Sequence, residues 1–115
     1  MQLRSQIEAA IADAPGIVTP EAVARACSSL GLSATSFCDL FAKEVAQAYL
    51  DGSISWSDGD AAMNALSGYF FVHLPKDVPF PDYAFGAFLA FDAGEALEEP
   101  DNERTTKQQL VALQE

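Results

Sequence analysis

The sequence predicts an all-α fold, a single small helical domain of four to six helices. Apolar residues recur every three or four positions in successive stretches, which is the helical period. Capping residues, glycines and prolines separate these stretches. Half of the 115 residues are apolar and eight are Phe, so the chain can build a core without disulfides or metal.

The first two helices are delimited by their end signals. Residues 3–14 present an apolar face that ends at Pro15-Gly16. Thr19 precedes Pro20 and an acid, which predicts an N-cap and the first turn of a second helix. Gly31 is a natural stop for that helix.

A third helix is expected to start near Ser33 or Thr35 and to end at Asp51-Gly52. A short extended link over residues 53–56 follows. Ser57, with Asp60 three residues later, resembles a capping box and predicts the start of a fourth helix.

The fourth helix has an alternative at its end. Its apolar stripe runs from Ala62 to Phe70, but Gly68 weakens it, so residues 68–74 could instead form a short extended segment. Three prolines then exclude helix and central strand from residues 75–81.

A fifth helix is predicted over residues 82–98, apolar nearly all round in its first half. Gly86, Ala90 and Gly94 are four apart and form a smooth ridge where another helix can approach closely. Such a helix is either central to the core or part of an interface. We place one domain over residues 1–103 and a short C-terminal helix or flexible tail over residues 104–115.

Charge is the sequence feature that points outside the molecule. The chain has a formal net charge of −11, and residues 44–103 hold twelve acids and one base, Lys76. Acidity alone is common in bacterial-type cytosolic domains, where it serves solubility. The clustering of acids beside the most apolar helix instead favours a docking surface that steers a basic partner.

The leading hypothesis is therefore a non-enzymatic, cytoplasmic protein-binding module with a basic protein partner. Its sharpest form is an inhibitor, comparable by physical analogy with small acidic immunity proteins that neutralise nucleases. The partner-binding residues are predicted to be four acids for steering and two candidate aromatic anchors: Asp92, Glu95, Glu98, Glu99, Tyr83 and Trp56. For Trp56, which lies in a predicted link, a place in the core is favoured over the role of anchor. Asp92, Glu95 and Glu99 should share one helix face.

Two alternatives remain open. One is a homodimer without separable activity, formed through the 83–94 helix and its ridge. The other is a metal-binding or ligand-binding domain built from four residues: Asp51, Asp58, Asp60 and His73. The string from Asp51 to Asp58 resembles half of an EF-hand loop, but Gln47 and Tyr49 stand where leading ligands belong, which favours a plain helix stop and link.

Other classes find little support. His73 is the one histidine, and no nucleophile motif or phosphate loop accompanies it, so we expect no catalytic residues, no metal and no cofactor. Six bases cannot support nucleic-acid binding. No apolar run approaches the roughly twenty residues that span a bilayer.

Cys27 and Cys38 are expected to be buried free thiols, with a bridge as the alternative.

Overall fold

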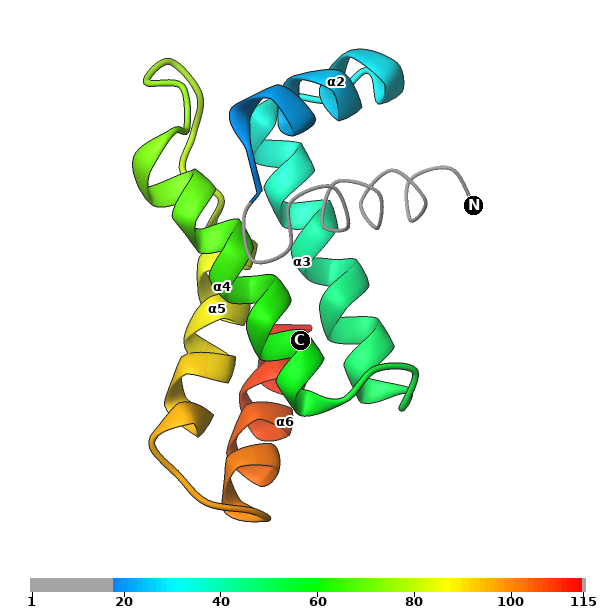
Figure 1. Ribbon diagram of the computed structural model, residues 1–115, viewed down its shortest axis with the longest axis vertical. Helices are drawn as coiled ribbons and strands as arrows, with labels where there is room; N and C mark the ends of the chain where they lie inside the picture. Colours follow the sequence, from blue (N-terminus) through cyan, green and yellow to red (C-terminus); the bar gives the residue numbers. More distant parts are fainter. Residues whose placement is uncertain (1–17, 115) are drawn as a thin grey trace.

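The computed structural model describes residues 18–114, which form five helices and no strand (Figure 1). The helices are α2 (Pro20–Leu30), α3 (Ala34–Leu50), α4 (Trp56–Val72), α5 (Asp82–Glu95) and α6 (Asp101–Leu113). The all-α prediction is confirmed. The helix predicted over residues 3–14 lies outside the described residues. The extended alternative for residues 68–74 is wrong, because α4 continues to Val72.

Three helices begin at a serine or threonine that caps the first turn. Thr19 Oγ1 accepts a hydrogen bond from the Ala22 N–H at 3.1 Å, and Ser33 caps α3 in the same way. The α4 cap is Ser55, whose Oγ accepts from the Asp58 N–H at 3.1 Å, so the predicted cap at Ser57 is wrong. Starting two residues earlier brings Trp56 into the first turn, where its ring packs against α5 and α6.

Helix α5 is the centre of the packing: α3, α4 and α6 all lie against it, and α2 lies against α3 (Figure 1). Six large apolar side chains are fully buried between these helices: Phe37, Phe41, Phe91, Met63, Leu66 and Leu110. Complete burial of each contributes about 1.5–3 kcal/mol. Side chains from α3, α4, α5 and α6 therefore meet in one core around α5.

The predicted small-residue ridge of α5 packs against α6 of the same chain. A Cβ atom on Gly86 would lie 2.7 Å from Leu113 Cδ2, and one on Gly94 would lie 2.8 Å from Thr106 Oγ1. The ridge is thus occupied within the chain. A second copy of the protein would have to contact another part of the 83–94 helix.

The start of α5 is fixed by α3. Pro81 precedes α5 and has no side-chain oxygen to cap it. Asp39 of α3 takes this role, since its Oδ1 accepts a hydrogen bond from the Ala84 N–H at 3.0 Å. Thr35 Oγ1 also donates a hydrogen bond to the carbonyl oxygen of Pro79 in the preceding loop. These two contacts tie the proline-containing loop and the first turn of α5 to α3.

Helix α5 ends at Glu95 and not at residue 98. The Leu97 N–H bonds the carbonyl of Gly94 at 3.0 Å, which tightens the last turn. Pro100 disfavours helical backbone at Glu99. Glu99 therefore leaves the helix, and the prediction that it shares a face with Asp92 and Glu95 is wrong.

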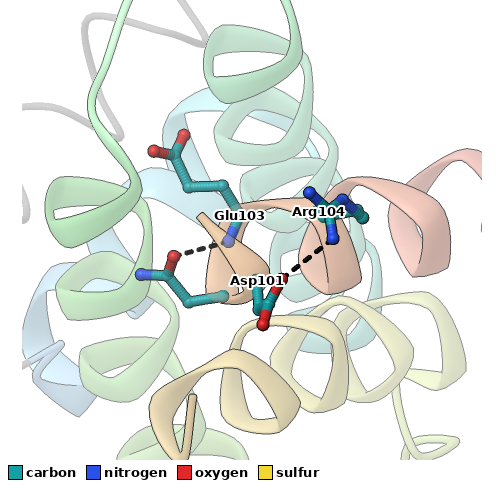
Figure 2. A network of polar contacts seen from close by, with 4 residues as sticks. Asp101, Glu103 and Arg104 are labelled. Atoms are coloured by element: carbon teal, nitrogen blue, oxygen red, sulfur yellow. Dashed lines mark hydrogen bonds and ion pairs between the residues drawn. The ribbon is translucent and has the colours of Figure 1, made fainter. Parts of the chain in front are cut away.

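Helix α6 starts at Asp101 and runs past residue 103, where the sequence analysis ended the domain. Figure 2 shows its first turn: Asn102 Oδ1 accepts from the Glu103 N–H at 2.8 Å, and Arg104 pairs with Asp101 at 2.9 Å. The Tyr49 hydroxyl of α3 donates to Glu103 Oε1 at 3.1 Å. The first two contacts lie within α6, and the third joins α6 to α3.

None of the helices found in residues 18–114 has the length and apolar character required to cross a bilayer. Cys27 and Cys38 are free thiols, the second fully buried. Burial raises the pKa of Cys38 to about 12, with the nearby negative charge of Asp39 as a smaller cause. A thiol of this kind is a poor nucleophile.

Candidate functional site

Five apolar side chains from the end of α4, the loop after it and the first half of α5 form a partly exposed surface, which we call the phenylalanine patch: Phe71, Phe80, Phe85, Phe88 and Leu89. Phe71 keeps 54% of its surface in water, and Phe80 and Leu89 each keep 41%. Monomeric proteins rarely leave several large apolar side chains exposed together, and such patches commonly mark interaction sites.

The rings of the patch contact one another as well as solvent. The ring centroid of Phe71 lies 5.9 Å from that of Phe85 and 5.7 Å from that of Phe88, both nearly perpendicular. The loop between α4 and α5 brings Phe80 back over the end of α4, 5.6 Å from the largely buried Phe70. Edge-to-face contacts of this kind hold aromatic rings in place. The patch is therefore a preformed surface.

Acidic residues continue the outer face of α5 beyond the patch. Phe85, Phe88, Asp92 and Glu95 follow each other at spacings of three or four, so they share one side of the helix. Asp92 and Glu95 are both exposed. The outer face of α5 is thus aromatic in its first half and negative in its second half.

Helix α4 adds Asp60 and Asn64 to this negative region. The Asn64 side-chain amide donates to Glu95 Oε2 at 3.0 Å. Asp60 Oδ1 is buried and has no N–H or O–H donor in the described part of the chain. Desolvation by burial, a hydrogen bond with Glu95 and the negative charges of Glu95 and Asp92 raise the pKa of Asp60 to about 7. We call Asp60, Asp92 and Glu95 the acidic end.

The other predicted steering acids lie farther along the chain. Glu98 and Glu99 are exposed in the link between α5 and α6. Two neighbouring acids are engaged within the protein, because Asp101 pairs with Arg104 and Glu103 accepts from Tyr49. The negative region at this end of the molecule therefore consists of the acidic end and the link.

The two predicted aromatic anchors lie away from the patch. The Trp56 indole N–H donates to Thr106 Oγ1 at 2.9 Å, and this hydroxyl donates to the Ala90 carbonyl at 2.9 Å. Trp56 thus connects α4, α5 and α6. Tyr83 is half-buried beside Lys43, whose Nζ lies 5.3 Å from the ring centroid.

Tyr83 lines an open groove of about 390 Å³ whose other lining residues are Lys43, Gln47, Leu113 and Gln114. This groove has no convergent set of charged groups. Sequence reasoning did not name Phe71 or Phe80 as exposed residues. The available signal was the run of phenylalanines on both sides of the proline-containing loop, and for the helix after that loop the sequence left open a place in the core or in an interface.

The four residues of the metal alternative do not meet. Asp51 lies after α3, where its Oδ1 accepts from the Ser53 N–H at 3.0 Å. Asp58 and Asp60 lie near the start of α4, whereas His73 follows its last residue, roughly 20 Å away at 1.5 Å per residue. Among residues 18–114, no group of three or more His, Cys, Asp or Glu could hold a metal ion.

Comparison with known proteins gives no assignment: no protein-family model, curated protein or solved structure matches this chain. The function must therefore be argued from the surface formed by the phenylalanine patch and the acidic end.

Proposed function

We propose that this protein is a non-enzymatic, cytoplasmic protein-binding module that docks a basic protein on the phenylalanine patch and the acidic end. One observation carries the proposal: the outer face of α5 passes directly from the half-buried rings of Phe85 and Phe88, which contact the exposed Phe71, to the exposed carboxylates of Asp92 and Glu95. Aromatic residues supply much of the binding energy in protein interfaces, and charges around them raise the association rate and select the partner.

The exposed rings leave free energy available for binding. Complete burial of a Phe or Leu side chain contributes about 1.5–3 kcal/mol. Phe71, Phe80 and Leu89 are each about half exposed, so covering them would contribute roughly 3 kcal/mol in total. This free energy is too small for stable binding by itself, so the half-buried rings around these side chains and the neighbouring charges must also contribute.

The sign of the charge favours a basic partner. With a net charge of −11, the protein attracts cationic surfaces and repels other acidic molecules, including a second copy of itself. A role as inhibitor of a basic enzyme fits this arrangement, because such complexes gain from fast, electrostatically steered association. Glu98 and Glu99 would add to the long-range attraction.

The proposal is tested by capture of partners from an extract of the source cells at low salt, with two matched pairs of variants. F71S/L89S removes two exposed side chains of the patch, and L97S/V111S removes two equally exposed ones elsewhere. D92N/E95Q removes two negative charges from the outer face of α5, and E21Q/D58N removes two from the first turns of α2 and α4. Thermal melting of each variant confirms folding.

We expect a basic protein that binds the wild type, L97S/V111S and E21Q/D58N. F71S/L89S should release it, whereas D92N/E95Q should slow its association, and added salt should slow the wild type in the same way. A partner retained equally by F71S/L89S would overturn the proposal, as would a failure to capture any patch-dependent protein. Concentration-dependent dimers lost in F71S/L89S would instead support self-association.

A further inference from the structure

At one glycine of the helices, no contact among residues 18–114 explains why a side chain is absent. Gly59, Gly86 and Gly94 each lie in close contact with a neighbour, because an added Cβ atom would lie 2.7–2.8 Å from a neighbouring side chain. Gly68 of α4 is different: among residues 18–114, a Cβ atom there would meet nothing within 4 Å. Its φ is not positive either, so the backbone does not require glycine. Glycine within a helix costs stability relative to alanine, and here no internal contact offsets that cost.

Gly68 lies in the middle of the proposed docking surface. It is exposed on α4, four residues after Asn64 and three before Phe71. Phe71 contacts the rings of Phe85 and Phe88, while Asn64 bonds Glu95. The two helices are therefore antiparallel neighbours. Because Gly68 has no side chain, the outer surface of α4 is recessed there, between the patch and the acidic end.

We propose that the partner supplies a short basic amphipathic helix that packs closely over Gly68. This proposal rests on the proposed function and names the element that the surface accepts. The apolar side of that helix covers Phe71 and Phe88, and its Lys or Arg residues face Asp92 and Glu95. Glycine allows the backbone of a ligand to approach closely, which a side chain at this position would prevent.

The dimensions and backbone of the surface favour a helix as the docked element. The outer face of α5 from Phe85 to Glu95 spans about 15 Å at 1.5 Å per residue, which is close to three helical turns. A helix with apolar residues at spacings of three, four and seven fits along such a pair of helices. Binding by β-strand addition needs an exposed sheet edge, and residues 18–114 contain no sheet, so this mode does not apply.

The test uses a phage-displayed library of randomised 14-residue helical peptides selected on the full-length protein. Selected peptides are then titrated against G68Q, which adds a neutral, helix-favouring side chain, and against A112Q, the same addition at an exposed site on α6. G68A measures the cost of the glycine: its melting temperature should rise by roughly 3 to 5 °C. F71S/L89S and D92N/E95Q are included as before.

We expect enriched peptides with helically spaced apolar residues and adjacent Lys or Arg, whose Kd rises at least tenfold in G68Q and in D92N/E95Q but not in A112Q. Equal affinity for G68Q, or enrichment of peptides without helical spacing or basic residues, would overturn the inference. So would a selection that enriches nothing. If F71S/L89S loses the captured cellular partner while G68Q retains it, the proposed function stands and the helix over Gly68 is wrong.

Discussion

Replacement of Asp60 by Asn should remove a pH-dependent loss of stability. Asp60 has its pKa raised to about 7 from an ordinary value of 3.8, first by burial and then by Glu95 and Asp92. Between these two values the folded protein keeps a proton that the unfolded chain releases. Stability therefore falls as the pH rises from about 4 to about 7. Three pKa units correspond to at most about 4 kcal/mol, and because water screens this partly exposed group, we expect about 1 to 2 kcal/mol.

The assay is urea denaturation at pH 5 and pH 8 for the wild type, D60N and D58N. Asp58 is an exposed aspartate in the first turn of the same helix, so D58N controls for the change in net charge. The free energy of unfolding of D58N should fall from pH 5 to pH 8, and for D60N this fall should be smaller by about 1 to 2 kcal/mol. D60N should therefore be the more stable of the two variants at pH 8. If both variants show the same difference, burial and the neighbouring acids do not raise the pKa of Asp60 as described.

Three further substitutions test the packing. T106V leaves the Trp56 indole N–H without an acceptor and should lower the free energy of unfolding by about 1 to 3 kcal/mol in urea, whereas the neighbouring T105V should not. D39A removes the cap of α5 and should cost about 0.5 to 2 kcal/mol; D39N keeps an acceptor oxygen, so an equal loss in both would contradict the capping role. G94A places a methyl group 2.8 Å from the Thr106 hydroxyl and 2.9 Å from a backbone carbonyl of α6, so it should lower the free energy of unfolding by about 1 to 3 kcal/mol. An unchanged melting temperature would show that α6 can move away.

Local sequence signals predicted the helices well because each helix end depends on nearby residues. Thr19 and Ser33 cap the helices that they precede, and Gly31 ends α2 in a left-handed conformation with φ of 69°. The end of α5 and the cap of α4 were misplaced for different reasons. The cap of α4 depends on the packing of Trp56 against α5 and α6, and this contact between distant segments leaves no local pattern. The end of α5 was expected near the break at Pro100, whereas the last turn already closes where the Leu97 N–H bonds the Gly94 carbonyl.

The candidate site was predicted only in outline. The acids Asp92 and Glu95 were named, because charge can be read directly from residue type. The exposed rings were not, since Phe71 and the buried Phe70 are neighbours of identical type, and only the packing of α5 on α4 decides which one faces water. Tyr83 and Trp56 were named as candidate anchors because residue type alone does not show that α6 and α3 pack beside them.

The bridge from Trp56 through Thr106 to α5 gives the protein an optical reporter of its own. The sequence holds a single tryptophan, so its fluorescence comes from one place, on the inner side of the helix whose outer side carries the proposed docking surface. The indole ring lies 6.3 Å from that of Phe91, between α4 and α5. Any displacement of α5 should alter the polarity around this ring, so occupancy of the far side can be followed without attaching a dye.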